Sequence, residues 1–531
     1  MSLFPLCLGQ TRARLVQAGA VLVAGALIAG CGNGYRPVVT PINPTGPAPQ
    51  PSSLAIVVSS PSTTTPGVAT IIDYSGDTIV AQATIGPGPS TFTVDETGSN
   101  GYTINSDGTL TDFPVSSQLQ TKNVEFTTLP STAAVLNLFS PSAGLWAADL
   151  NGNVADVLTG FPATFKLAIP VAPTPLMIVG PGLIGERDYA ISQNFTDTTG
   201  VACNVSPRTV TTPGAADAIE VASYSISATI PVGICPVYAV QTPDRQRLFV
   251  LNRGDDTVSV INTQNNTLDS CVCPPTGCVN QSNQTYFCHP ALPLSTTAIA
   301  TLKTRYAGTT TPYSPPNGTT GMIATAGPVY AEYNLSTSQI VVADYDGGTI
   351  SVIDVSLDEY GNDSSTFGTT FTIPVGTTAT PNPAAVTVLA DGSRAYTANQ
   401  NDDSTGSGSG NGTVSIVNLT SHTLEKTLPV IGHPRTVVST QNSLYGKVYA
   451  AAPDSPYLTI VRTDEDIVDT TILVEGNIVD VRTTTQNGSS GNANNISRKP
   501  GYGQPCNLSP QQLTAAGFAT PTLAQCQLQT P

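Results

Sequence analysis

The sequence predicts an all-β fold made of one small unit that is repeated along the chain. The composition supports this class, because 47 glycines and 44 prolines among 531 residues supply many turns, while Val, Ile and Thr crowd the segments between them. No window long enough for a soluble helix keeps an apolar period of 3.6 residues. A strand–turn–strand segment recurs at Leu248–Asn262, Ile340–Asp354, Ala395–Asn418 and, in a weaker form, Lys447–Val461. Such a repeat predicts a radial or stacked β architecture.

The clearest copy indicates what each part of the unit does. Leu248–Leu251 is a short apolar run, typical of a strand buried on both faces, and Asn252–Asp256 consists of turn-forming residues. Thr257–Ile261 is rich in β-branched residues and predicts the next strand. Pro-Val-Gly follows an apolar strand at Pro231–Gly233 and again at Pro374–Gly376. The unit is therefore an inner strand, a middle strand, a turn, a third strand, an outer strand and a crossover.

Counting units by their middle strands gives eight candidates, of which the second to the fourth are weakly marked. They are Leu54–Val58, Gly101–Ile104, Leu145–Ala148, Tyr189–Ser192, Leu248–Leu251, Ile340–Ala343, Ala395–Ala398 and Val448–Ala451. The repeats begin at a middle strand with no inner strand before it, and they end with a spare apolar segment, Asn477–Arg482. We therefore expect this last strand to complete the first unit, which would cover edges that the sheet otherwise exposes.

The repeat resembles the YVTN-type β-propeller repeat, whose consensus is Tyr-Val-Thr-Asn, a short acidic turn, and Thr-Val-Ser-Val-Ile-Asp. Phe249–Asn252 followed by Thr257–Asn262 is similar to it, as is Ile340–Asp354. The resemblance is strong over 237–486 and faint over 53–235. It implies a β-propeller over residues 53–486, with seven or eight four-stranded blades closed by the C-terminal strand. The family usually has seven blades, whereas the count of middle strands favours eight.

The N-terminus has the features of an export signal over residues 1–30. Arg12 and Arg14 precede an apolar run that ends Leu-Ile-Ala-Gly before Cys31. This run resembles the bacterial lipoprotein lipobox, which implies cleavage before Cys31 and lipidation of that residue, with several acyl chains as a stable anchor. Gly32, rather than Asp, follows the cysteine and favours the outer membrane of the cell envelope. An ordinary signal peptide or an uncleaved helix is the alternative. Six prolines in 31–52 predict an extended tether.

Eight further cysteines would remain in the exported chain. They are Cys203, Cys235, Cys271, Cys273, Cys278, Cys288, Cys506 and Cys526. An even number in an oxidising compartment predicts disulfides, of which the simplest set is Cys203 with Cys235, Cys506 with Cys526, and two bonds inside the Cys-rich insertion 269–295. A zinc site from the cysteines of this insertion and His289 is the alternative. Residues 487–531 form a polar tail with two of the cysteines.

Charge and motifs narrow the possible functions. The formal net charge is −16 with only 20 Lys and Arg, so nucleic acid is an unexpected partner. The three histidines, His289, His422 and His433, belong to no catalytic pattern, and each is expected in a turn or at the surface. The tripeptide Arg253-Gly254-Asp255 spells an adhesion signal, and the acidic turns could bind calcium, but a turn role is favoured for both. Trp146 and Tyr333 could line a ligand-binding face, but packing in the core or in the blades is favoured.

We therefore expect no catalytic residue, no cofactor and no metal site. The sequence favours an envelope-anchored, non-catalytic propeller that acts as a binding platform for a protein, a glycan or peptidoglycan. The long insertions at 269–295 and 401–411 would build its binding face. A propeller hydrolase or lyase of lactonase type is the alternative. A redox-linked subunit, as in quinoprotein amine dehydrogenases, is a third reading, although the chain has no Cys-x-x-Cys-His motif.

Overall fold

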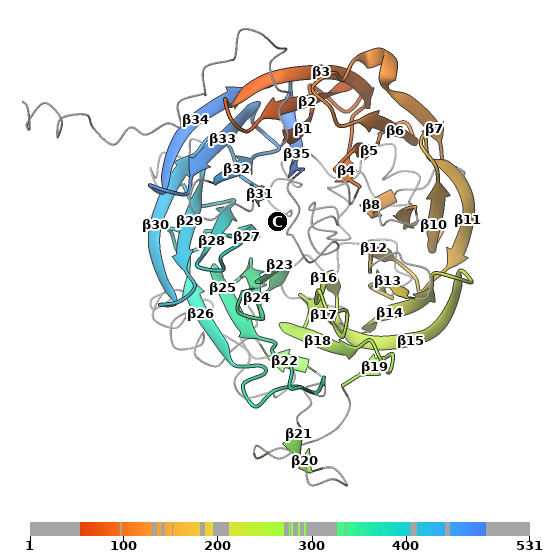
Figure 1. The fold of residues 1–531 in the computed structure, drawn as a ribbon, viewed down its shortest axis with the longest axis vertical. Coiled ribbons are helices and arrows are strands. Elements are labelled where there is room, and N and C mark those ends of the chain that lie inside the picture. Colours follow the sequence, from red (N-terminus) through yellow and green to blue (C-terminus); the bar gives the residue numbers. More distant parts are fainter. Residues whose placement is uncertain are drawn as a thin grey trace, which may run out of the picture. The chain divides into compact units, whose positions relative to one another are not determined.

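Eight antiparallel sheets stand around one axis and form an eight-bladed β-propeller (Figure 1). The computed structural model describes residues 54–95, 98–129, 135–139, 144–150, 152–180, 186–194, 212–269, 276, 278–279, 285–286, 291–293, 327–334, 336–359, 361–403, 411–440 and 446–484. None of these described residues belongs to a helix with the length and apolarity needed to span a bilayer. The prediction of an all-β propeller is confirmed, with eight blades rather than seven.

Blades 1 to 4 occupy the first half of the ring. Their strands are β1 (Leu54–Ser60), β2 (Pro66–Asp73) and β3 (Thr78–Pro87) in blade 1; β4 (Thr91–Val94), β5 (Asn100–Ile104), β6 (Thr109–Pro114) and β7 (Glu125–Thr128) in blade 2, with the 3-10 turn η1 (Thr121–Asn123); β8 (Val135–Phe139), β9 (Leu145–Asp149), β10 (Val154–Thr159) and β11 (Thr164–Pro170) in blade 3; and β12 (Pro175–Val179), β13 (Arg187–Ser192), β14 (Pro213–Glu220) and β15 (Ser225–Ile234) in blade 4.

Blades 5 to 8 complete the ring. Their strands are β16 (Pro236–Gln241), β17 (Arg247–Asn252), β18 (Thr257–Asn262), β19 (Thr267–Leu268) and β22 (Ala291–Pro293) in blade 5; β23 (Pro328–Asn334), β24 (Gln339–Asp344), β25 (Thr349–Asp354) and β26 (Thr370–Pro374) in blade 6; β27 (Pro383–Val388), β28 (Arg394–Asn399), β29 (Gly412–Asn418) and β30 (Thr423–Val430) in blade 7; and β31 (Thr436–Ser439), β32 (Lys447–Ala451), β33 (Tyr457–Arg462) and β34 (Ile467–Leu473) in blade 8. All eight middle strands that the sequence predicts are second strands of blades.

The C-terminal strand β35 (Asn477–Thr483) closes the ring as the inner strand of blade 1. It pairs antiparallel with β1, with Val481 opposite Val57 and Arg482 opposite Ile56. The backbone N–H of Leu54 also donates to the hydroxyl of Thr484 at 2.8 Å. Val481 is fully buried and packs with Val57 in an apolar cluster that joins blades 8 and 1. The closure expected from the sequence is therefore confirmed.

In blades 2, 3, 5, 7 and 8 the aromatic position of the repeat contacts the next blade. This position is the third residue of the second strand in the clearest copies, and its side chain contacts the turn between the third and outer strands of the following blade. The pairs are Tyr102 with Phe161, Trp146 with Tyr224, Phe249 with Phe367 and Tyr449 with Tyr74, at ring-centroid distances of 6.5, 6.0, 6.2 and 6.2 Å. In blade 7 the hydroxyl of Tyr396 instead donates to Asp466 of blade 8 at 2.5 Å. The Tyr of the repeat is thus a contact between blades.

The Asn of the repeat ties the opposite end of the second strand to the preceding crossover. The Asn252 amide donates to the hydroxyls of Thr257 at 3.1 Å and Ser259 at 2.8 Å, and Ser259 accepts the N–H of Gly233 at 3.1 Å. We call this arrangement the amide clasp. A Cβ on Gly233 would lie 2.5 Å from the Asn252 side chain, so the crossover needs glycine there. The same clasp recurs in blades 2 and 7 with Asn105, Thr109, Thr111 and Gly86, and with Asn399, Thr413, Ser415 and Gly376.

Candidate functional site: the insertion-bearing face

Three long connections begin and end at strand ends on the same face of the ring. Because the four strands of a blade alternate in direction, the turn between the second and third strands and the crossover to the next blade lie at the same end of every blade. Three connections at this end are long, namely 193–212 in blade 4, 294–327 between blades 5 and 6, and 400–411 in blade 7. The corresponding turn of blade 5 has only the four residues 253–256. We call this end the insertion-bearing face.

The Cys-rich insertion has a different position from these three connections. It interrupts the outer strand of blade 5, so that β19 pairs with Ile261 and Asn262, while β22 pairs with the other end of β18. Within the described part of the insertion, β20 (Cys278–Val279) and β21 (Thr285–Tyr286) form a separate antiparallel pair. Residues 291–293 therefore return to the blade, and β20 and β21 lie outside the ring beyond blade 5 (Figure 1).

Arg253 joins blades 5 and 6 at the base of the insertion-bearing face. We call the contacts of Arg253, Tyr345 and Asp402 at this base the floor of the face. Its guanidinium donates to both carboxylate oxygens of Asp346, with Nε–Oδ2 and NH2–Oδ1 distances of 3.0 and 2.8 Å. The Arg253 guanidinium also lies 5.1 Å from the ring centre of Tyr345. Although Arg253 is only 4% exposed, this two-pronged pairing compensates for the loss of hydration. The contact fixes the place where the connection 294–327 rejoins the ring.

Tyr345 continues this floor into blade 7. Its hydroxyl donates to the side-chain oxygen of Gln400 at 3.1 Å, and its carbonyl accepts the amide of Asn382 at 3.0 Å. Burial raises the pKa of the Tyr345 phenol, although the nearby Arg253 acts in the opposite direction, so the phenol keeps its proton and its role as a donor. Gln400 is the first residue of the connection 400–411. The base of that connection is therefore held by a packed side chain of the neighbouring blade.

Asp402 secures the same connection from the other side. Its carboxylate accepts the backbone N–H groups of Thr377 and Thr378, at 2.8 and 2.7 Å, and the Thr413 hydroxyl at 2.6 Å. Burial alone would raise the pKa of Asp402, but these hydrogen bonds to the charged form outweigh it and lower the pKa. Asp402 thus stays ionised and ties the preceding crossover to the base of the connection 400–411.

The Arg-Gly-Asp tripeptide has a structural role in the turn. Arg253 is occupied by Asp346, and Asp255 accepts the N–H of Ile234 at 3.0 Å and the hydroxyl of Thr257 at 2.7 Å. Both charged side chains are thus engaged within the ring, as the turn interpretation expects. The acidic turns likewise direct their carboxylates at N–H groups and hydroxyls. Over the described ranges, no group of three or more His, Cys, Asp and Glu side chains is arranged to hold a metal ion.

Most of the cysteines singled out from the sequence lie outside the described residues. These are Cys31, Cys203, Cys271, Cys273, Cys288, Cys506 and Cys526, together with the signal, the tether and the tail. Cys235 lies fully buried between β15 and β16, and Cys278 begins β20. The disulfide pairings therefore stay predictions, as does the lipid on Cys31.

Two of the three histidines and the two large aromatic candidates take part in contacts between or within blades. His422 stacks on Phe371 of the preceding blade with ring centres 3.7 Å apart, and burial lowers its pKa. His433 contacts Asp454 of blade 8, whereas His289 lies outside the described residues. Trp146 is 1% exposed and Tyr333 is 9% exposed, so both are packed in the ring as expected.

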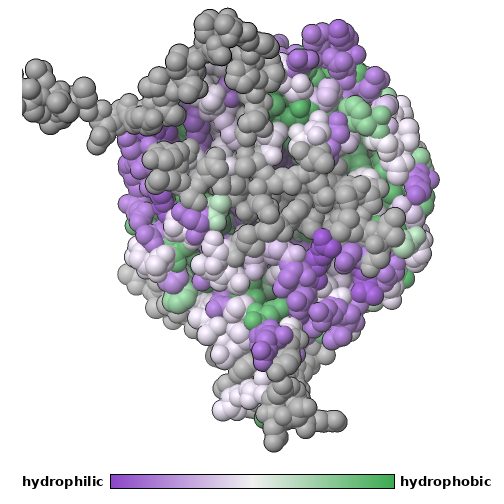
Figure 2. Space-filling view, viewed as in Figure 1, coloured by the Kyte–Doolittle hydropathy of each residue, from purple (hydrophilic) through white to green (hydrophobic). Residues whose placement is uncertain are grey.

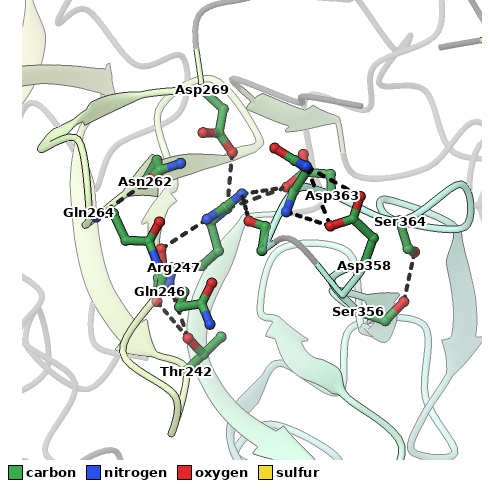
Figure 3. A network of polar contacts seen from close by, with 12 residues as sticks. Thr242, Gln246, Arg247, Asn262, Gln264, Asp269, Ser356, Asp358, Asp363 and Ser364 are labelled. Atoms are coloured by element: carbon green, nitrogen blue, oxygen red, sulfur yellow. Dashed lines mark hydrogen bonds and ion pairs between the residues drawn. The ribbon is translucent and has the colours of Figure 1, made fainter. Parts of the chain in front are cut away.

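A buried ionic network on the other face of the ring was not anticipated from the sequence (Figure 3). Arg247, at the start of β17, places its guanidinium 3.1 Å from a carboxylate oxygen of Asp269 and 3.1 Å from one of Asp363, and it donates to the carbonyl of Gly361 at 3.0 Å. Burial raises the pKa of Asp269 to about 6 even though Arg247 favours its charged form. The network joins a loop of blade 6 to the point where the Cys-rich insertion begins.

Equivalent cations at the first position of the second strand also join blades. Lys447 of blade 8 lies 2.6 Å from Asp77 of blade 1, and Arg394 of blade 7 pairs with Asp466 of blade 8. These ion pairs make the network around Arg247 one member of a series around the ring.

In the view of Figure 2, hydrophilic and neutral residues make up most of the described surface, and apolar residues form only small patches.

Comparisons with known proteins give no family assignment. No family model matches the chain, and no curated protein matches it. Similar solved structures include a proposed 6-phosphogluconolactonase from Bacteroides fragilis NCTC 9343, with a TM-score of 0.47, 15% identity, and coverage of 82% of this chain and 99% of that one. AztD from Citrobacter koseri has a TM-score of 0.49 and 8% identity, over 81% and 97%. The dihydro-heme d1 dehydrogenase NirN has a TM-score of 0.49 and 12% identity, over 82% and 75%.

These likenesses concern shape alone. All of the identities are at or below 15% and the TM-scores are below 0.5. The named activities belong to those proteins, and they do not decide between a catalytic and a non-catalytic propeller here. The eight-bladed fold rests on the strand pairing of the chain itself.

Proposed function

We propose that this chain is an envelope-anchored, non-catalytic propeller that binds a protein, glycan or peptidoglycan partner through its insertion-bearing face. The observation that carries the proposal is that the connections 193–212, 294–327 and 400–411 all attach at strand ends on one face of four successive blades. Insertions in surface connections cost little folding free energy, and binding residues are concentrated in such loops on rigid scaffolds.

The floor beneath these connections supports this reading. Arg253 with Asp346, Tyr345 with Gln400, and the hydrogen bonds of Asp402 fix the points where two of the connections meet the ring. A rigid base reduces the entropy that a binding loop loses when it meets its partner. We infer that the ring acts as the scaffold and the three connections as the variable contact surface.

The proposed anchor is Cys31 with its several acyl chains, followed by the Pro-rich tether. This part of the proposal rests on the sequence before Cys31. Metabolic labelling with a radioactive fatty acid tests it in the native cell envelope. The label should enter the wild-type chain and be absent from Cys31→Ala, and a soluble, unlabelled wild-type chain in the exported fraction would refute the anchor.

A thermal-shift screen of the mature chain from Cys31 to Pro531 tests the binding role. The panel holds peptidoglycan fragments, envelope glycans, divalent metals and model lactones, and a ligand that binds only the folded state raises the melting temperature. A matched variant lacks Ser404–Gly410, the middle of the connection 400–411. It keeps Gln400, Asp402 and the first residues of β29, so the contacts of the floor remain.

The outcomes separate the two candidate functions. A shift with a glycan or muropeptide that is lost in the deletion variant supports the proposal, provided that the melting temperature without ligand is unchanged. A shift that is the same in both proteins would remove this connection from the binding surface. A shift with a lactone, together with hydrolysis of that lactone, would overturn the non-catalytic role in favour of a lactonase-type hydrolase.

A further inference from the structure

The joint between blades 7 and 8 lacks the amide clasp. The asparagines of the amide clasps lie at or directly after the end of the second strand, as Asn105, Asn252 and Asn399 in blades 2, 5 and 7. In blade 5, Asn252 lies five positions after Arg247, the residue of the second strand that pairs with the end of the third strand. Lys447 is the corresponding residue of blade 8, and five positions after it the chain has Ala452 instead of an asparagine. Ala452 has no side-chain amide to donate, so another contact must hold the crossover that enters blade 8.

That contact is an ion pair between a histidine and a carboxylate. The backbone N–H of His433, in the crossover 431–435, donates to Asp454 at 2.8 Å, and its ring Nδ1 lies 2.6 Å from the other carboxylate oxygen. Asp454 belongs to the turn between β32 and β33 on the insertion-bearing face. A Cβ on the neighbouring Gly432 would lie 2.8 Å from Asp454, so the crossover lies close against this carboxylate.

The same crossover contacts the end of the connection 400–411. The N–H of Gly432 donates to the side chain of Asn411 at 3.2 Å, and the carbonyl of Gly432 accepts the N–H of Gly412 at 2.7 Å. A change in the crossover would therefore reach the point where this connection rejoins β29.

We propose that His433 and Asp454 form a pH-responsive clasp, in which protonated His433 holds the crossover 431–435 on blade 8 and its deprotonation loosens the attachment of the connection 400–411. The clasp itself follows from the ring alone, and its consequence for partner binding rests on the proposed function. The three amide clasps contain no titrating group, and the carboxylates Asp255 and Asp402 that accept crossover N–H groups beside two of them have no histidine partner in those bonds. The joint between blades 7 and 8 differs because its carboxylate is paired with an imidazole.

The charges around His433 set the direction of the response. The hydrogen bond that protonated His433 donates to Asp454 raises the pKa of His433 most strongly, and burial lowers it. The negative charges of Asp454 and of Asp403, from the β28–β29 connection, raise it further. Arg435 is the other charged residue of the crossover. Because the pKa in the folded chain lies above the ordinary value of 6.5, the stabilisation is complete below that value and is lost as the pH rises through the raised pKa.

Hydrogen exchange of the full mature chain without ligand tests the clasp, so a failed binding proposal would not affect the result. His433→Gln serves as the non-titrating variant, and Asp454→Asn removes the partner charge. After correction for intrinsic rates, hydrogen exchange in 430–436 and 411–413 of the wild type should rise about two- to fivefold as the pH increases through the pKa of His433. The expected rise is small because a half-exposed ion pair contributes little free energy to the attachment. The step should be absent in His433→Gln, while 252–259 serves as the internal control.

Proton NMR of the imidazoles provides the second readout, and it does not depend on the stability of a variant. The chain has three histidines, so single substitutions assign the signals. His433 should titrate above 6.5, and its pKa should fall in Asp454→Asn. The proposal is overturned if His433 titrates at or below 6.5 in the wild type, or if His433→Gln keeps the same exchange step.

Discussion

Replacement of Asn252 by Ala tests the physical account of the repeat. The side chain is fully buried and donates two hydrogen bonds, at 3.1 Å to Thr257 and 2.8 Å to Ser259. Each such bond contributes about 0.5–1.5 kcal/mol net, so their loss should lower the free energy of unfolding by about 1–3 kcal/mol. The cost should extend to the joint between blades 4 and 5, because Ser259 also accepts the N–H of Gly233.

Urea denaturation followed by circular dichroism measures the change. Asn265→Ala is the matched control, because Asn265 is exposed in the turn between β18 and β19 and its loss should change stability by less than about 0.5 kcal/mol. Gly233→Ala is the complementary probe, since its Cβ would collide with the Asn252 side chain. In the double variant with Asn252→Ala the collision with Asn252 is relieved and only the close approach to Asp255 remains, so the two effects should add only in part. Equal stability of Asn252→Ala and Asn265→Ala would refute the clasp.

Three further predictions concern buried charge and ring closure. Arg247→Leu leaves Asp269 and Asp363 without their shared cation, so chemical denaturation should record a loss of about 3–5 kcal/mol, and a loss below 1 kcal/mol would contradict the network. Burial raises the pKa of Asp112 from 3.8 to about 7, so the folded chain holds this proton at pH values where the unfolded chain has lost it. The free energy of unfolding should therefore rise by up to about 1.4 kcal/mol per pH unit as the pH falls from 7 towards 3.8. Asp112→Asn should flatten this slope, and an unchanged slope would contradict the raised pKa. Val481→Asp buries a charge in the closing strand and should lower the melting temperature of the whole ring in calorimetry, whereas melting like that of the wild type would disprove closure by β35.

Much of the ring could be predicted because the repeat residues perform the same physical task in several blades. The Asn of the second strand and the hydroxyls of the third strand are visible in blades 5 and 7, where they form the amide clasp. Blade 4 was weakly marked because a carboxylate replaces the hydroxyl there. Asp217 accepts the N–H of Ala172 at 2.6 Å, so the crossover that enters blade 4 is still bound to the third strand. Because the residue is Asp rather than Ser or Thr, the sequence of blade 4 does not match the repeat at this position.

The ion pairs between blades 5 and 6 could not be predicted to the same extent. Arg253 and Asp346 are separated by 93 residues, and Arg247 and Asp363 by 116, so nothing local in the sequence indicates either pair. Their proximity follows from the stacking of blade 6 against blade 5. The sequence did predict that Arg253 belongs to a turn, but the carboxylate that it binds depends on the three-dimensional arrangement of the blades.

Site-specific photo-crosslinking in intact cells tests the central claim, that partners bind at the insertion-bearing face. A diazirine side chain replaces Ile431, which is 42% exposed beside the clasp of blade 8, or Asn265, which is exposed on the opposite face. The account predicts one discrete crosslinked product from position 431, lost when Ser404–Gly410 is deleted, and none from position 265. A product from position 265 alone, or equal products from both positions, would contradict it.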